Sequence, residues 1–288
     1  MKGTTPNLPG ILVDGTVQNQ GQNQNRYKPI CQLFNNIYRF ATLYDTFNRI
    51  PVFSAYTFTG PPTDPRPDEP WMIEPQLEGE NNSPIMQKIG GGQYEHQAGN
   101  YDYGKLKRKN SKNYNAVNRG HLFPNSHAHD LETQESTFTL TNIVPQVVSF
   151  NDGSWREMEE NVRKKLMTDC FSDNRNIEAY VVTGAVPSKS NTLNKRVNIP
   201  QLLWTAFCCL DKNKIDNKTN KKKKWMAKAH WGWNNKVQKE TLNQLTLGEL
   251  EEKLNEYHTD PVKVFPEDCP RGPKPTTPPP TQLEEFLP

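Results

Sequence analysis

The middle of this 288-residue chain reads NRGHL at residues 118–122, TNIVPQ at 141–146 and NDGSWREME at 151–159. Hydrolysis of a phosphodiester requires a base, a means of neutralising charge at phosphorus, and groups that hold the phosphate in line. The three runs offer an imidazole, a guanidinium group, amide oxygens and carboxylates, so together they contain a side chain suited to each task.

Each polar side chain of this stretch has a chemical role that it could fill. His121 can accept a proton from water, because an imidazole is partly neutral near physiological pH. Arg119 offers a bidentate fork to phosphate oxygens. Asn151 can give Mg²⁺ a neutral oxygen ligand, and Glu159 could hold metal-bound waters. Asn142, at the end of a predicted strand, could orient that water cluster or a phosphate oxygen.

Each of these residues, taken alone, has an ordinary explanation. A histidine beside an arginine is more often a surface or hydrogen-bonded residue than a catalyst. An asparagine at the start of a helix is usually an N-cap, and a glutamate on a helix is usually solvated. The order and spacing of the whole set, rather than any single member, indicate a catalytic site.

The periodicity of the chain predicts an α+β domain. Residues 38–58 form two β-rich runs around a turn at 45–49, which indicates a hairpin. Ser154 and Glu157 have the spacing of a capping box, and the apolar residues that follow them predict a helix to about Met167. Further strands are predicted at 137–148, 179–186, 201–210 and 225–233, and a second helix at 241–257.

Composition divides the chain into three parts. Residues 1–26 are predicted to form an irregular arm, residues 27–260 the domain, and the proline-rich residues 261–288 a tail with no core of its own. No run of 18 apolar residues predicts a membrane span. Cys208 and Cys209 point to opposite sides of a predicted strand. One could therefore be a core residue and the other a disulfide partner, with Cys269 as a candidate mate.

The three central runs resemble the motifs of the DNA/RNA non-specific endonucleases, the ββα-metal nucleases. Those motifs are Asp-Arg-Gly-His, Asn-x-x-Pro-Gln and Asn-x-x-x-Trp-x-x-x-Glu. This chain matches them at Arg119-Gly120-His121, at Asn142 to Gln146, and at Asn151, Trp155 and Glu159. The segments RFATLYDTFNRIPVFSAY, RPDEPWMIEPQ, VVTGAVP and LWTAFCC also resemble the endonuclease domain-containing 1 proteins of vertebrates.

This resemblance implies a ββα-metal fold, with a mixed or antiparallel sheet and a central helix that carries the metal site. It implies an endonuclease that acts on DNA and RNA through their backbone phosphates, with Mg²⁺, or Mn²⁺ in its place, as cofactor. His121 would be the general base and Asn151 the direct metal ligand, while Asn142 and Glu159 support the site. Arg119 would contact phosphate, and Arg66 is the expected counterpart of a further arginine of the family.

Asn118 departs from the family motif, which has Asp at this position. Asn keeps a hydrogen-bonding oxygen but loses the charge. We expect the Asp of the family to be structural, so that Asn118 is compatible with activity, although the lost charge could weaken the enzyme. The alternative is a nuclease-fold binding or immune-associated protein with weak or lost catalysis. The resemblance implies secretion, whereas the first residues lack the apolar run of a signal peptide, so an intracellular location is the alternative.

Two further features lie close to the central runs. A basic segment with few acids precedes them and could track the backbone of DNA or RNA, with a solvated loop as the alternative; its candidate substrate-binding residues are Lys105, Lys107, Arg108 and Lys109. The net charge of +3 does not by itself imply a nucleic-acid partner. His127 and His129 form an HxH pair that could belong to a second metal site.

Overall fold

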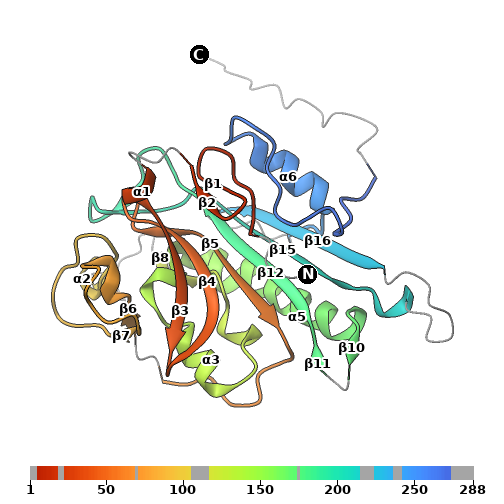
Figure 1. The fold of residues 1–288 in the computed structure, drawn as a ribbon, viewed down its shortest axis with the longest axis horizontal. Helices are drawn as coiled ribbons and strands as arrows, with labels where there is room; N and C mark the ends of the chain where they lie inside the picture. The colour runs from red at the N-terminus through yellow and green to blue at the C-terminus, as the bar shows by residue number, and fades with distance from the viewer. Residues whose placement is uncertain are drawn as a thin grey trace.

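A six-stranded antiparallel sheet organises the molecule (Figure 1). The computed structural model describes residues 5–18, 23–68, 71–104, 117–173, 176–214, 224–235 and 242–273. The strands lie in the spatial order β16-β15-β12-β5-β4-β3. Their bounds are β3 Tyr27–Phe34, β4 Ile37–Asp45, β5 Ile50–Phe58, β12 Ala179–Val186, β15 Leu202–Leu210 and β16 Trp225–Trp233. The predicted hairpin and the three later strands are confirmed.

Strand β15 shows why both faces of this sheet are covered. Leu203 and Phe207 pack into one hydrophobic cluster, whereas Leu202 and Trp204 pack into a second. Successive side chains of a strand point to opposite faces, so a strand buried on both sides is apolar along its whole length. The sheet therefore separates two cores.

One face of the sheet, called here the cleft face, carries helix α5 (Arg156–Asp169) and a ribbon of β8 (Val117–His121) and β9 (Ile143–Val147). Apolar residues of α5 and of the ribbon share the first cluster with the sheet. Short helical segments link these elements: η3 Asn125–His127, α3 Leu131–Ser136, η4 Leu140–Asn142, α4 Val148–Phe150 and η5 Asn151–Trp155.

The opposite face, called here the clasp face, is covered by α6 (Leu247–Asn255) and by both ends of the described chain. Leu8 and Leu12 from the N-terminal segment and Val262 and Phe265 from the C-terminal segment are buried in the second cluster. In Figure 1, α6 lies in front of the sheet and α5 behind it. The folded unit thus extends beyond the expected boundaries at residues 26 and 261, because these apolar side chains cover α6 and the sheet.

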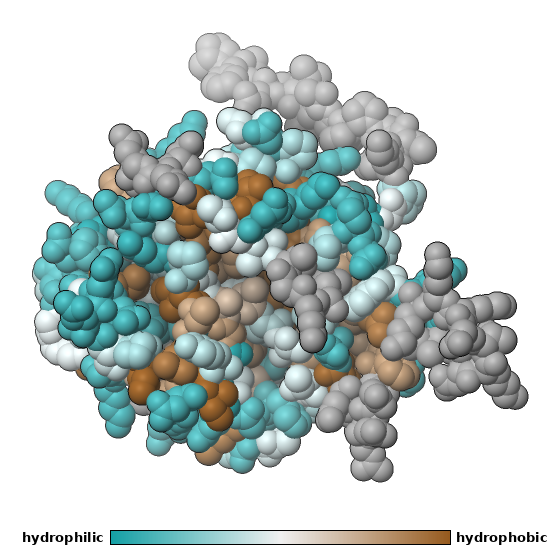
Figure 2. All heavy atoms as spheres, in the orientation of Figure 1, coloured by the Kyte–Doolittle hydropathy of each residue, from teal (hydrophilic) through white to brown (hydrophobic). Residues whose placement is uncertain are grey.

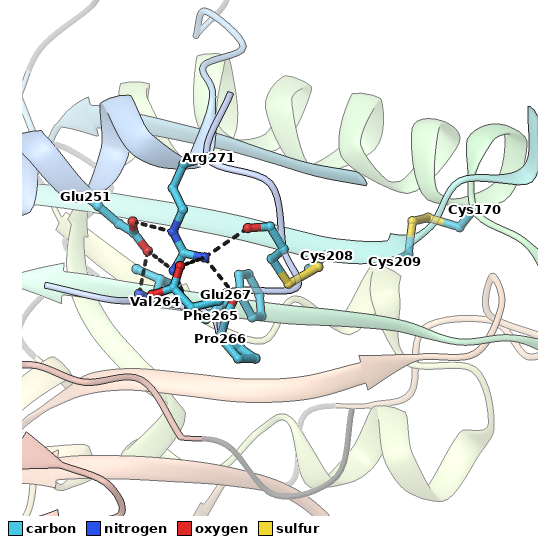
Figure 3. The surroundings of a disulfide bond; sticks show 10 residues. Cys170, Cys208, Cys209, Glu251, Val264, Phe265, Pro266, Glu267 and Arg271 are labelled. Carbon is cyan, nitrogen blue, oxygen red and sulfur yellow. Dashed lines mark hydrogen bonds and ion pairs between the residues drawn. A yellow bond between two sulfur atoms is a disulfide. The ribbon is translucent and has the colours of Figure 1, made fainter. Parts of the chain in front are cut away.

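An ion pair and a disulfide hold the C-terminal segment on this face (Figure 3). Cys208 of β15 is bonded to Cys269. Arg271 donates to both carboxylate oxygens of Glu251, at 3.0 and 3.1 Å, and to the carbonyls of Pro266 and Cys269 at 2.8 and 2.9 Å. We call Glu251, Arg271 and the Cys208–Cys269 bond the clasp.

The second cysteine of the pair also forms a disulfide. Cys209 faces the other side of β15 and is bonded to Cys170, at the C-terminal end of α5. The candidate mate Cys269 is therefore confirmed as the partner of Cys208. The suggestion that one of the two cysteines is a core residue and the other a disulfide partner is too narrow, since both are buried and both are bonded. Cys31 is an exposed free thiol.

Helix α5 begins differently from the sequence prediction. Its N-cap is Trp155, with no side-chain cap, so the expected capping box does not start it. The chain instead enters α5 through a π-helical turn, Asn151–Trp155, in which Gly153 has φ −107° and ψ −114°. The second helix is shorter than predicted and begins after Thr246, whose capping box with Glu249 does form.

The remaining elements are short. They are β1 Leu12–Val13, β2 Thr16–Val17, α1 Asn23–Arg26, β6 Met72–Ile73, η1 Pro75–Leu77, β7 Gln87–Lys88, α2 Asn100–Gly104, β10 Ser172–Asp173, β11 Asn176–Ile177, β13 Thr192–Leu193, β14 Val197–Asn198 and η6 Lys212–Lys214. Figure 2 shows hydrophobic residues gathered at the centre of the viewed face and framed by hydrophilic ones. Within the described ranges, no helix has the length and apolar character needed to cross a membrane.

Candidate active site

A cleft of about 720 Å³ opens on the cleft face. His121 and Arg119 reach it from β8, Asn151 from the π turn, Glu159 from α5, and Arg66 from the loop before β6. The fold therefore brings together five of the side chains that the sequence singled out. Lys105, Lys107, Arg108 and Lys109 lie outside the described residues.

The β8–β9 ribbon sets the position of His121. Gly120 pairs with Val144, and a Cβ atom added at Gly120 would lie 2.0 Å from Oε1 of Gln146. Only glycine fits at this close approach. The Arg-Gly-His and Pro-Gln runs are thus two sides of one packed ribbon, which holds His121 at the end of its strand.

His121 lies in an aromatic cage. Its ring is 5.8 Å from that of Trp71 and 5.1 Å from that of Phe138, and its Nε2 is buried with no hydrogen-bond partner among the described residues. Burial, and then the charges of Arg66 and Arg119, lower the pKa of His121 to about 3. The imidazole is therefore neutral at physiological pH and can accept a proton.

Two guanidinium groups flank this histidine. Arg119 donates to Oδ1 of Asn100 at 2.7 Å, and its Cζ lies 4.4 Å from the centre of the Trp71 ring. Cζ of Arg66 lies 5.1 Å from the centre of the Phe138 ring. The rings that surround His121 therefore also contact both arginines, which keeps positive charge beside the imidazole.

Asn151 is oriented by the residue that departs from the family motif. Its Nδ2 donates to Oδ1 of Asn118 at 2.8 Å. Its own Oδ1 accepts no hydrogen bond from the described residues. The amide is thus held by its nitrogen, and its oxygen remains available in the cleft. Asn118 needs only an oxygen for this task, which explains how Asn can stand in place of Asp.

Glu159 is partly buried on the cleft side of α5. Burial raises its pKa to about 8, and the side chain of Trp155 acts in the opposite direction. A cation nearby would favour the ionised carboxylate. The π turn lies between Asn151 and Glu159. The two side chains are therefore not placed around one axis at the regular spacing of a continuous α-helix.

The donor set fits a hard cation held largely through water. Among the described residues, no three His, Cys, Asp or Glu side chains come together as a metal cage. Mg²⁺ keeps several waters and commonly takes only one or two protein oxygens. The free Oδ1 of Asn151 and the carboxylate of Glu159 match that requirement, and Mn²⁺ accepts the same oxygen donors.

Asn142 has a different place from the expected one. It is fully buried. Its Oδ1 accepts from Ser54 Oγ and from the Phe123 N–H, and its Nδ2 donates to the carbonyls of Phe123 and Thr137. With both ends of the amide in use, Asn142 cannot orient a water cluster or a phosphate. It fixes the backbone that follows His121.

Several cleft residues were missed by sequence reasoning. Arg163 and Arg156 line the cleft from α5. Arg163 is four residues after Glu159 and Arg156 three before it, so helical spacing from Glu159 would have found both. Asp64 and Asp152 also line the cleft.

The HxH pair does not form a metal site. His127 is buried between the Tyr56 hydroxyl, at 2.8 Å, and the Glu159 carbonyl, at 3.0 Å. Nδ1 of His129 donates to the carbonyl of Pro61 at 2.8 Å. His127 therefore links β5 to α5, whereas His129 bonds the loop that contains Pro61.

Comparison with known proteins identifies the family of this chain. The family model described as DNA/RNA non-specific endonuclease matches residues 22–263. The chain is 34% identical over 186 residues to the endonuclease domain-containing 1 protein of Homo sapiens and 33% identical over 184 residues to that of Mus musculus. Each match covers 62% of this chain and 34% of the relative, so the chain spans about a third of the length of these relatives.

A solved structure shares the fold. In the crystal structure of the EndoG/EndoGI complex, one chain superposes with a TM-score of 0.51 at 18% sequence identity. The match covers 76% of this chain and 82% of that chain. At this identity the likeness concerns the arrangement of strands and helices alone.

Proposed function

We propose that this chain, which belongs to the DNA/RNA non-specific endonuclease family, is a metal-dependent endonuclease that hydrolyses phosphodiester bonds of DNA and RNA without sequence preference. One observation carries the proposal: a neutral imidazole and a free amide oxygen, His121 Nε2 and Asn151 Oδ1, belong to side chains that line the same cleft. The substrate range is proposed for this domain, because the match covers only 34% of the human relative.

His121 acts as the general base in this proposal. Its low pKa in the free protein comes partly from Arg66 and Arg119. A phosphate bound to these two arginines neutralises their charge, so the pKa of His121 rises toward a value at which the imidazole can accept a proton from water. The base is thereby strengthened when substrate is present.

The arginines of the cleft hold the phosphate. Arg119 and Arg66 flank His121, and Arg163 lies on α5 one turn after Glu159. Contacts to backbone phosphate carry no direct sequence information, so recognition through these groups predicts cleavage of many sequences. The same groups can bind the phosphates of DNA and RNA.

Asn151 would hold Mg²⁺, or Mn²⁺, directly, and Glu159 would hold it through water. The ion, when bound, neutralises charge at the scissile phosphate and stabilises the leaving oxygen. Asn118 keeps the Asn151 oxygen turned into the cleft through its bond to Nδ2. Export of the protein is also proposed, since its two disulfides suit an oxidising compartment.

Plasmid cleavage tests this function. We expect the protein to nick supercoiled plasmid and to degrade RNA with Mg²⁺ but not with EDTA. His121→Ala should lower the rate by about 10²–10⁴-fold, the usual contribution of a positioned base, and should leave DNA affinity unchanged. Rates close to wild type in His121→Ala would reject the mechanism. A wild-type protein that binds DNA without cleaving it would favour the binding-protein alternative.

A further inference from the structure

His127 connects the central sheet to helix α5 through two hydrogen bonds. The residue belongs to η3 (Asn125–His127) and is 3% exposed. Its Nδ1 lies 2.8 Å from the hydroxyl of Tyr56 on β5, and its Nε2 lies 3.0 Å from the backbone carbonyl of Glu159. The roles of the two nitrogens then follow from their partners.

A carbonyl oxygen can only accept, so Nε2 of His127 must carry the hydrogen. In a neutral imidazole, Nδ1 is then an acceptor, and the Tyr56 hydroxyl donates to it. Burial lowers the pKa of His127 to about 4, which keeps the ring neutral. In this series of hydrogen bonds the Tyr56 hydroxyl donates to Nδ1 of His127, and Nε2 of His127 donates to the Glu159 carbonyl.

The hydrogen bond from His127 reaches α5 near its start, just after the irregular π turn. The π turn at Asn151–Trp155 separates the expected metal ligand from Glu159, and Gly153 within it has non-helical angles. Trp155, Met158 and Val162 attach the start of α5 to the core by apolar contacts, which are non-directional. The bond from His127 is directional and meets the helix at Glu159 itself.

Tyr56 is itself tied to the strand of the general base. Its ring stacks on that of Phe123 at 3.8 Å between centroids and an interplanar angle of 12°. Phe123 follows His121 by two residues and bonds Asn142 through its backbone. One connected group of residues therefore reaches from the end of β8 to Glu159.

We propose that His127, oriented by Tyr56, is a positioning residue that sets the placement of Glu159 relative to His121 and Asn151. The inference rests on the proposed nuclease function for its catalytic readout. In this proposal His127 does not contact substrate. It acts on the site through its hydrogen bond to the backbone carbonyl of Glu159. The predicted consequence of losing it is a poorer response to Mg²⁺ rather than a simple loss of folded protein.

The first test compares His127→Phe, which keeps a ring but removes both hydrogen bonds, with His127→Gln, which keeps a donor and an acceptor. We expect His127→Phe to raise the Mg²⁺ concentration for half-maximal plasmid cleavage about tenfold and to lower kcat by a similar factor, as outer-shell changes at metal sites do. His127→Gln should recover most of both losses, and Tyr56→Phe should fall between them.

The matched control is His258→Phe. His258 also donates from a ring nitrogen to a backbone carbonyl, that of Pro9 at 3.0 Å, but it lies among the residues of the clasp face. We expect its Mg²⁺ response to equal that of wild type. If His127→Phe has the wild-type Mg²⁺ response and kcat per folded molecule, the proposal is overturned. A rise of the same size in His258→Phe would also overturn it.

A second measurement does not depend on cleavage. Hydrogen exchange of the backbone amides at residues 152–163 should become faster in His127→Phe and in Tyr56→Phe, while exchange in β12 and β15 stays as in wild type. Unchanged exchange at 152–163 would overturn the positioning role. If wild type fails to cleave but this local change is seen, the proposed function fails and the positioning role stands.

Discussion

Glu74, on the cleft side of the sheet, and Glu251, on the clasp face, are 4% and 8% exposed, yet they have different partners. Arg271 and the Val264 N–H bind the carboxylate of Glu251. Glu74 accepts a 3.3 Å hydrogen bond from the hydroxyl of Thr139, and burial raises its pKa to about 8. Burial also raises the pKa of Glu251, but Arg271 and the Val264 N–H act in the opposite direction. The carboxylate on the clasp face therefore has a cation and a backbone donor, whereas the Glu74 carboxyl has the Thr139 hydroxyl.

The same difference extends to other polar groups. Among the described residues, buried atoms without a hydrogen-bond partner include Nε2 of His121, Nε1 of Trp155, the hydroxyl of Tyr103 and the amide of Gln146. None of the unpartnered atoms belongs to α6 or to the clasp. Each such group costs about 1–3 kcal/mol when left unpaired. Of the residues named, His121 and Tyr103 line the cleft, where a ligand could pair with their unpartnered atoms.

Arg271→Met should have the largest effect on stability. It leaves the Glu251 carboxylate buried without its cation, and breaking a buried ion pair costs about 3–5 kcal/mol. Urea denaturation would measure the loss, and kcat/KM below the unfolding range should not change. Lys263→Met is the control, because its pair with Glu267 is exposed to solvent and should contribute little to stability. An altered Mg²⁺ response in Arg271→Met would contradict the separation of the two faces.

Asn151→Ala should lower the cleavage rate by about 100-fold or more and raise the Mg²⁺ requirement. Changes in the outer shell of a metal site already cost about 10–100-fold, and Asn151 is the proposed direct ligand. A magnesium titration at fixed DNA concentration measures both quantities. Asn255→Ala on the clasp face is the control: it removes an acceptor for the Val262 N–H at 2.8 Å and should change stability alone. An unaltered titration curve for Asn151→Ala would exclude this ligand.

Glu74→Gln should change how stability depends on pH. The folded-state pKa of Glu74 is about 8, above the ordinary value of 4.5. Between these values the folded state holds a proton that the unfolded state has released, so stability falls as pH rises from about 4.5 to 8. Gln cannot ionise, so the variant should gain about 3 kcal/mol of stability relative to wild type between pH 5 and pH 8. Thermal melts of both proteins at pH 5 and pH 8 measure the gain. If the difference in stability between variant and wild type were the same at both pH values, the raised pKa of Glu74 would be contradicted.

Asn118→Ala should have a smaller catalytic effect, about tenfold, because it frees the Asn151 amide without removing a ligand. Asn118→Asp keeps an oxygen acceptor for Asn151 Nδ2 and should cleave at least as fast as wild type. Mg²⁺ titrations of the two variants distinguish the geometric role from the charge. If Asn118→Asp were as slow as Asn118→Ala, the hydrogen bond to Asn151 would not explain position 118.

Local sequence patterns were sufficient for several elements of the fold. Residues 179–186 and 225–233 are strands with the predicted bounds, since their residues favour β structure and are packed on the sheet. The hairpin of β4 and β5 was likewise predicted from two β-rich runs around one turn. The ordered His, Asn and Glu set indicated the family because its spacing reflects a β-ribbon followed by a helix.

Other features depend on contacts between distant segments. Asn142 was expected in the water shell, yet its surroundings come from Ser54 on β5 and Phe123 after β8. The Asn-x-x-Pro-Gln motif gives no indication of either contact. The start of α5 was also mispredicted, because a π turn packed against the core replaced the local capping box.

Chain order and residue type sufficed to identify the chemistry available here, since a base, an arginine and oxygen donors must be encoded as side chains. Their pKa values, the pairing of Asn118 with Asn151, the two disulfides and the link from His127 to Glu159 required the folded chain. Burial and hydrogen bonding arise between residues far apart in sequence, and a pattern read along the chain carries no measure of either.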